Sequence, residues 1–190
     1  MFRAENQQER LKKIGWITGL IDGEGCFSIH FVKQPERHKE GKKIRRGYTI
    51  GYQVAHEFAV VQGKRSLGSL KELQTYFGIG GIYINHRHDN HKEDLYRYSV
   101  VRRQDLLKVI IPFFEQNQLH TAKKQDFKIF VQCVKAMEGG EHLTSAGAIK
   151  IAKLTSKMNH RKSRADLIRI LRDQTPGPDH KSGEERVPSA

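Results

Sequence analysis

The first third of the chain contains two hydrophobic patterns. One is a continuous apolar stretch, and the other is a stretch in which apolar and polar residues alternate one by one. Residues 8–21 predict a helix, and its part from Ile14 to Ile21 carries no charged residue. A helix that is apolar on all sides is a buried helix. Residues 27–32 then alternate strictly between apolar and polar side chains, which predicts a half-buried strand.

The next stretch, residues 34–47, is too charged for a core, and we expect a long hairpin loop there. A second strand is predicted over residues 48–62. It is too long to stay regular, and its pattern shifts around residues 55–57, as at a β-bulge.

The rest of the chain continues as helices around one hairpin. Ser66 is expected to cap a helix that ends at Phe77 and buries Leu67, Leu70, Leu73 and Phe77. The hairpin strands are expected at residues 82–87 and 95–101, and four more helices at residues 104–116, 121–137, 144–156 and 163–172. We predict one α+β domain over residues 1–173 and a disordered tail over residues 174–190, which are rich in proline, glycine and charge.

The charge balance indicates the class of partner. The 190 residues include 34 Lys and Arg against 21 Asp and Glu, a formal net charge of +13. Such an excess favours nucleic acid over a membrane. The chain has neither a signal peptide nor the apolar run of about 20 residues that a membrane span needs, so we expect a cytoplasmic or organellar protein. Cys26 and Cys133 have no metal-binding spacing and are expected to be reduced.

Residues 17–25 read I-T-G-L-I-D-G-E-G and carry the strongest chemical signal. Gly23 and Gly25 are expected to end the helix and leave Asp22 and Glu24 as possible ligands for a hard divalent cation. On the pattern alone, two solvated acids after a helix end are the alternative. Gly15, Thr18, Gly19 and Asp22 share one face, which would let a second helix approach closely.

This segment resembles the signature of the LAGLIDADG homing endonucleases, and the resemblance continues to about Arg172. Ile17, Thr18, Gly23 and Glu24 are conservative departures from that signature, and Glu24 lengthens the usual aspartate by one methylene. The resemblance implies a motif helix at a dimer interface, a curved four-stranded antiparallel sheet that forms a DNA-binding saddle, and helices packed behind it.

The resemblance also implies a catalytic set. Glu24, with the Gly23 carbonyl as a second oxygen, would bind Mg²⁺ or another divalent cation such as Mn²⁺, while Asp22 would stabilise the helix end or the dimer contact. Gln62 would order the water network, and Arg65 would offset charge on the phosphate. Lys123 is the first choice for the active-site lysine and Lys124 the second.

Because the motif occurs once, the family pattern implies a homodimer through Gly15, Thr18, Gly19 and Asp22 that cuts a long, pseudo-palindromic duplex and leaves short 3′ overhangs. The gene would lie in a mobile group I intron. The sheet residues expected to contact DNA are Ser28, His30, Lys33, Tyr83, Asn85, Arg87, Arg97 and Ser99. Contacts to the DNA backbone are expected from Arg45, Arg46, Arg161 and Lys162.

Three alternatives compete with parts of this interpretation. The cluster of His86, His88, Asp89 and His91 suggests zinc, but no further ligand completes a tetrahedral set, so base or backbone contacts are favoured. An RNA maturase that binds its own intron, or a DNA-binding regulator without cleavage, would use the same fold. The carboxylate at Glu24, with Gln62 and Lys123, favours the nuclease without excluding a dual function.

Overall fold

A computed structural model describes residues 2–34, 37–39, 42–45, 50–86, 94–158 and 163–173. The strands are β1 (Gly25–Lys33), β2 (Arg37–Lys39), β3 (Lys42–Arg45), β4 (Tyr52–Gly63), β5 (Gly81–Asn85) and β6 (Leu95–Val100). The α-helices are α1 (Phe2–Glu24), α2 (Leu67–Phe77), α3 (Arg103–Asp105), α4 (Ile111–Gln116), α5 (Lys123–Glu138), α6 (Ser145–Thr155) and α7 (Ala165–Asp173). Two 3₁₀ turns, Lys64–Ser66 and Glu141–Leu143, and one π-helical turn, Leu106–Ile110, complete the described elements.

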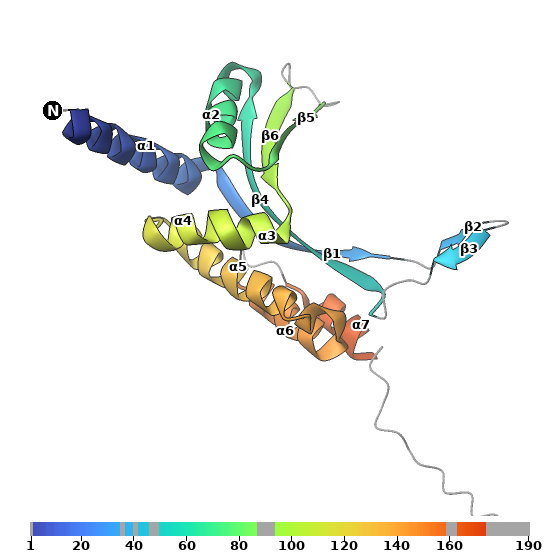
Figure 1. Ribbon diagram of the computed structural model, residues 1–190. Coiled ribbons are helices and arrows are strands. Elements are labelled where there is room, and N and C mark those ends of the chain that lie inside the picture. The colour runs from blue at the N-terminus through green and yellow to red at the C-terminus, as the bar shows by residue number, and fades with distance from the viewer. Residues whose placement is uncertain are drawn as a thin grey trace, which may run out of the picture.

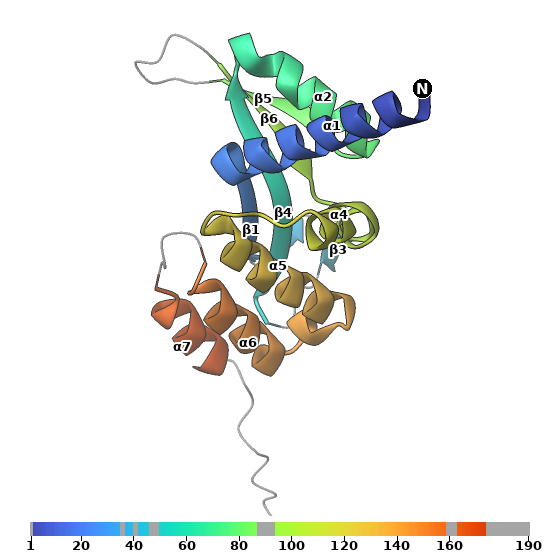
Figure 2. The ribbon, with the colours of Figure 1, turned by 90° about the vertical axis from the view of Figure 1, so that its left-hand side faces the viewer.

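The main sheet has four antiparallel strands in the order β1-β4-β6-β5, as the resemblance implied. The long strands β1 and β4 curve through the molecule, and helices cover only one side of them (Figure 1). None of the described helices lies on the opposite, concave side (Figure 1). The short strands β2 and β3 form a separate antiparallel ribbon inside the segment predicted to be a loop. Viewed from the side, α1 crosses the upper strands while α5 and α6 lie lower down (Figure 2).

The core lies between the sheet and this helical layer. Phe27 of β1 packs with its ring centroid 5.2 Å from that of Phe58 on β4 and 5.4 Å from that of Phe130 on α5. Tyr98 is fully buried, and its hydroxyl donates to the Ile79 carbonyl at 3.0 Å. The alternation predicted for the first strand is confirmed, because Phe27 and Ile29 are buried and His30 is exposed.

The predicted bulge near residues 55–57 is wrong. β4 pairs with β1 without a break from Gly25 opposite Val60 to Lys33 opposite Tyr52. The pattern seemed to shift because His56 occupies an inward position between Val54 and Phe58, where an apolar residue was expected. The strand also begins later than predicted, after Gly51, whose φ of 66° does not fit a strand.

The predicted helix over residues 104–116 is interrupted. A π-helical turn over Leu106–Ile110 separates α3 from α4. Pro112 lies at the start of α4, and its ring nitrogen cannot donate the hydrogen bond that an uninterrupted helix requires. The wider turn just before the proline accommodates this missing donor.

The predicted cap at Ser66 is also wrong in its chemistry. Ser66 precedes α2, but its side chain makes no capping hydrogen bond. The 3₁₀ turn Lys64–Ser66 brings the chain into the helix instead, and the Ser66 carbonyl accepts a hydrogen bond from the Ser69 hydroxyl at 2.7 Å. Leu70, Leu73 and Phe77 are buried as predicted, whereas Leu67 is only half-buried.

The motif helix does not stop at Ile21. α1 continues to Glu24, and β1 begins at the next residue, Gly25, with no loop between them. A Cβ atom at position 25 would lie 2.5 Å from Cγ2 of Ile21 and 2.7 Å from its carbonyl oxygen. Glycine is therefore required at position 25 because the strand leaves the helix in close contact with the preceding turn.

We expect Gly25→Ala to lower the free energy of unfolding by about 1–3 kcal/mol, because the added methyl group overlaps a backbone atom that cannot move aside. Chemical denaturation of the purified variant measures this change. Gly23→Ala is the matched control, since a Cβ there meets no atom within 4 Å. If both variants were equally stable, the tight junction would not constrain the fold.

Candidate functional site

The end of α1 is held against the start of α5 by Asp22. Its carboxylate accepts hydrogen bonds from the backbone N–H of His120 at 2.8 Å, the N–H of Thr121 at 3.1 Å and the Thr121 hydroxyl at 2.8 Å. Burial raises the pKa of Asp22, but these donors outweigh it and the pKa is lowered. Asp22 therefore joins two elements of one protomer, which agrees with its predicted role in stabilising the helix end.

Lys123 lies beside the motif, at the first residue of α5. Its Nζ donates to the carbonyl of Asp22 at 2.9 Å and also to the carbonyl of Gly23. The neighbouring Lys124 points elsewhere and donates to Oε1 of Gln118 at 2.8 Å. Of the two candidate lysines, the structure brings only Lys123 to the end of α1.

Glu24 is exposed at the last residue of α1 and, among the described residues, makes no hydrogen bond or ion pair. The next carbonyl back along the chain, that of Gly23, lies on the same helix end. No group of three or more His, Cys, Asp or Glu side chains within the described ranges could hold a metal ion. Of the two carboxylates at the end of α1, that of Asp22 is hydrogen-bonded to His120 and Thr121, and only that of Glu24 has no partner among the described residues.

The other two proposed catalytic residues, Gln62 and Arg65, lie at the end of β4 and in the turn that follows it. Gln62 is half-buried near the end of β4, two positions beyond Val60, which pairs with Gly25. The register therefore places Gln62 level with the last turn of α1. Arg65 lies three residues later, exposed in the 3₁₀ turn Lys64–Ser66.

The concave face of the sheet carries six of the eight sheet residues predicted to contact DNA. Strand pairing places Ser28 opposite Glu57 on β4, and Tyr83 of β5 opposite Arg97 of β6. Because paired residues of neighbouring strands share a face, the face also includes His30, Asn85 and Ser99. His30, Tyr83 and Asn85 are exposed there.

Lys33 does not belong to that face. β1 stays regular to its end, where Lys33 pairs with Tyr52, so Lys33 alternates with Val32 and falls on the same side as Phe31. The expectation that it joins Ser28 and His30 is wrong because it assumed a break in the alternation. Arg45 ends β3. The remaining predicted contacts, Arg46, Arg87, Arg161 and Lys162, lie outside the described residues, as do the C-terminal tail and three members of the possible zinc cluster, His88, Asp89 and His91.

Glu57 lies at the centre of the concave face and was missed by the sequence analysis. Its carboxylate accepts hydrogen bonds from Nε of Arg97 at 2.8 Å and from the Ser99 hydroxyl at 2.6 Å, with a second, shorter contact from Arg97. Nε2 of His30 lies 4.0 Å away from it. This acid therefore fixes the orientation of two predicted DNA contacts.

An uncovered small-residue face runs along α1. Gly15, Gly19 and Gly23 recur every four residues, and a Cβ at any of them would meet no atom within 4 Å in the protomer. Thr18, predicted to share this face, is instead buried within the protomer, and its hydroxyl donates to the Ile14 carbonyl at 2.8 Å. The open face is thus made of glycines.

The fold and the site define a family. The family model described as LAGLIDADG endonuclease matches residues 17–134 of this chain. The chain therefore belongs to the LAGLIDADG endonuclease family, as its motif indicated. Glu24, Gly23 and Lys123 all lie within the matched range.

Individual relatives agree with this assignment. The crystal structure of the homing endonuclease I-TnaI is 35% identical, with a TM-score of 0.66 over 85% of this chain and 97% of that one. I-SmaMI bound to cleaved DNA is 28% identical, with a TM-score of 0.66 over 91% of this chain and 52% of that one. A curated protein of Neurospora crassa named "Probable intron-encoded endonuclease 3" is 33% identical over 159 residues, which are 83% of this chain and 26% of that protein.

The chain spans between a quarter and a third of the length of the curated relatives that it matches. None of the helices formed by the described residues is long and apolar enough to cross a membrane.

Proposed function

We propose that this protein is a site-specific homing endonuclease that cuts both strands of a DNA duplex. The observation that carries the proposal is the position of the motif end, with Glu24 exposed and Lys123 beside it, at the edge of an uncovered concave sheet. A strand ribbon of this kind fits the major groove and presents side chains to base edges. The net charge of +13 favours the phosphate backbone as partner.

The oxygens at the motif end fit a hard divalent cation such as Mg²⁺ or Mn²⁺. The Glu24 carboxylate is exposed and has no partner among the described residues. The Gly23 carbonyl, the next oxygen along the helix, accepts from Nζ of Lys123 and has a second lone pair for the cation. Oxygen ligands of these two kinds are those that Mg²⁺ prefers. When bound, such an ion polarises the scissile phosphate and lowers the pKa of the attacking water.

The surrounding residues orient the reactants. Lys123 holds the carbonyls of Asp22 and Gly23, so that its positive charge lies beside the position that the scissile phosphate would occupy. Gln62 supplies an amide that orders water near the motif end, and Arg65 adds a positive charge from the following turn. Asp22 holds the helix end against α5 and leaves Glu24 as the carboxylate that faces solvent.

The active protein is a homodimer formed through the glycine face of α1. One protomer carries a single motif, and the structural match to this chain covers 52% of the I-SmaMI chain. A second copy packed on Gly15, Gly19 and Gly23 would bring two Glu24 carboxylates together, and an isologous interface makes the DNA target pseudo-palindromic. A mobile group I intron as the source of the gene belongs to the same proposal.

A randomised duplex library tests the proposal. We expect the purified protein to cut one pseudo-palindromic sequence in Mg²⁺ and to cut nothing in EDTA. Sequencing of the cut ends identifies the target and the overhang. Specific binding without cleavage in Mg²⁺ would instead indicate a DNA-binding regulator. Specific binding of intron RNA would indicate a maturase.

Substitution of the two neighbouring lysines should separate their roles. We expect Lys123→Ala to slow cleavage by about two to three orders of magnitude, a range typical for loss of one charged group that stabilises a transition state. Lys124→Ala, the matched control, should stay within about threefold, because Lys124 contacts Gln118 and not the motif. Single-turnover cleavage rates measure both. Equal losses would contradict the placement of Lys123.

Replacement of Glu57 should change the DNA sequence that the protein prefers to cut. In Glu57→Gln the charge that holds Arg97 is removed, so Arg97 becomes free to contact a base, and we expect a changed preference at one position of each half-site. A bidentate contact between arginine and guanine discriminates by about 1–3 kcal/mol. Cleavage profiling against all single-base variants of the target measures this change. An unchanged profile would show that Glu57 has no part in recognition.

A further inference from the structure

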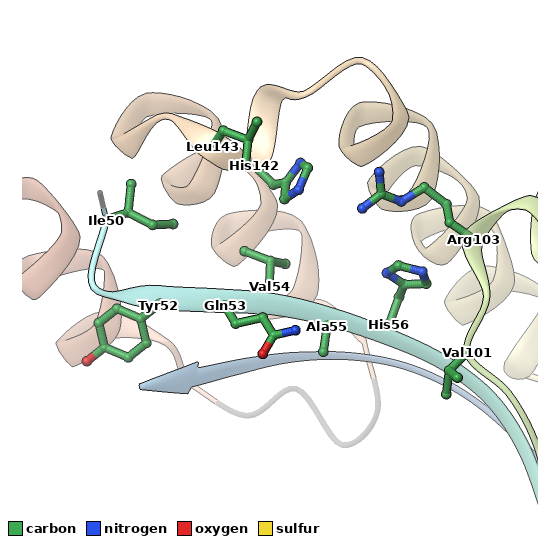
Figure 3. Close-up of a pocket in the computed structure, with 10 residues that line it drawn as sticks. All are labelled: Ile50, Tyr52, Gln53, Val54, Ala55, His56, Val101, Arg103, His142 and Leu143. Carbon is green, nitrogen blue, oxygen red and sulfur yellow. The ribbon is translucent and has the colours of Figure 1, made fainter. Parts of the chain in front are cut away.

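A cavity of about 690 Å³ lies beneath the sheet, between β4 and the turn Glu141–Leu143. Figure 3 shows Val54 and His56 pointing from β4 into it, with His142 and Arg103 approaching from the opposite side. Val54 and His56 alternate with the residues of the concave face, so the cavity opens on the helical side of the sheet. It is therefore separate from the motif end and from the predicted DNA surface.

Several buried nitrogens at the cavity make no well-formed hydrogen bond to any of the described residues. They are Nε of Arg103, Nδ1 of His142 and both ring nitrogens of His56, whose imidazole lies near the Val101 carbonyl without a well-aligned hydrogen bond. These groups come from three different elements and converge on one space (Figure 3). Buried polar atoms are nearly always hydrogen-bonded, so a cluster of unpaired ones indicates an unfilled binding role.

Two acids lie near the cavity, and one of them is paired with Arg103. The Glu138 carboxylate accepts from Nε2 of Gln104 at 2.7 Å and lies 3.7 Å from NH1 of Arg103, which itself donates to the Met137 carbonyl at 2.9 Å. Glu141 is paired with Lys150 at 2.8 Å. The described residues that line the cavity include no carboxylate. The charged group of the lining is therefore Arg103, which Glu138 approaches from outside, and the two histidines add positive charge only when they are protonated.

Burial and the nearby positive charges lower the pKa values of both histidines. Burial, followed by the charges of Arg103 and His142, lowers the pKa of His56 to about 4, and only the carbonyl of Val101 opposes the shift. Burial and Arg103 also lower the pKa of His142. An anion in the cavity would reverse both shifts, because it favours the protonated imidazole. A metal cation would be repelled by Arg103.

We infer that this cavity binds a small phosphate oxyanion, either inorganic phosphate or a phosphomonoester, through Arg103, His56 and His142. Donors that approach from three elements suit a tetrahedral oxyanion better than a planar carboxylate. Among the buried donors of the Arg103 guanidinium, only Nε is free, so the paired, two-bond contact that arginine usually makes with a carboxylate is not favoured here. A volume of about 690 Å³ also leaves room for an organic substituent. The inference does not depend on the proposed nuclease activity.

Titration of the full chain with inorganic phosphate tests the inference without any DNA. At about pH 6, where most histidines titrate, imidazole ¹⁵N–¹H spectra should show the rings of His56 and His142 shifting with saturation. Their pKa values should rise in phosphate. The exposed rings of His30 and His120 serve as internal controls, and sodium chloride at equal ionic strength controls for screening. Equal shifts of all four rings, or equal shifts in chloride, would overturn the inference.

Variants of the cavity lining distinguish phosphate binding in this cavity from non-specific binding to the basic surface of the protein. Arg103→Gln should weaken phosphate binding by about tenfold or more, whereas Arg103→Lys, which keeps the charge, should lose less. Arg103 also binds the Met137 carbonyl, so His142→Asn on the neighbouring turn provides a second variant if Arg103→Gln does not fold. A dissociation constant unchanged in the folded variants would show that phosphate binds elsewhere. A phosphomonoester, tested in parallel, identifies which form binds more tightly.

Discussion

Replacement of Glu24 by glutamine is expected to abolish cleavage while the protein still folds and binds its target. The substitution keeps the size of the side chain and removes only the charge that would bind the divalent cation. Glu24 is exposed and makes no hydrogen bond or ion pair with another described residue, so we expect the substitution to leave the fold intact. We expect the single-turnover rate to fall by about three orders of magnitude or more. DNA affinity, measured by gel shift, should stay within about tenfold.

Glu24→Asp is the matched control for this experiment. It restores the aspartate of the usual signature and keeps the charge, so cleavage should remain measurable in Mg²⁺. The comparison separates the charge of the side chain from its length. Full cleavage by Glu24→Gln would remove this residue from the metal site and with it the proposed chemistry.

Gly19→Leu should convert the protein to a folded monomer that does not cleave. A leucine at position 19 has open space in the protomer, because a Cβ there meets no atom within 4 Å. The same side chain would fill the space that a second α1 helix needs for close approach. We expect dimerisation to be lost at micromolar concentrations, as measured by analytical ultracentrifugation, with the midpoint of thermal unfolding of the protomer little changed.

Gly68→Leu controls for the general effect of this substitution. Gly68 is also exposed on a helix where a Cβ would meet no atom within 4 Å, but it belongs to α2 and not to α1. This variant should dimerise and cleave normally. A stable dimer of Gly19→Leu would show that the two copies meet through another surface.

The elements that were predictable from the sequence are those with a regular period. The apolar residues of β1 alternate because one face packs on Phe58 and Phe130, and those of α2 recur because Leu70, Leu73 and Phe77 face the core. The predictions failed where a single residue breaks the period for a local reason. The side chain of His56 can point inward because it lines a cavity beneath β4. Pro112 follows a π-helical turn that no periodicity indicates.

The sequence suggested residues for the candidate site but could not give their contacts. The motif suggested Glu24 and Gly23, and the family resemblance suggested the region of Lys123. Which of Lys123 and Lys124 reaches the end of α1 depends on where α5 begins, and the hydrogen bond between Thr121 and Asp22 fixes that point in the structure. Glu57 was missed because its role depends on pairing with distant strands. A charged residue between Ala55 and Ala59, in a strand interior, was the available signal.

The direct junction between α1 and β1 has a consequence for how recognition changes. Because Gly25 follows Glu24 without a loop, a change in the tilt of the motif helix must also tilt the first reading strand. In the proposed homodimer, mutations that alter the crossing angle of the two α1 helices would then move β1 against the DNA in both half-sites at once. New target sequences would therefore arise from substitutions at the subunit contact as well as from substitutions on the strands.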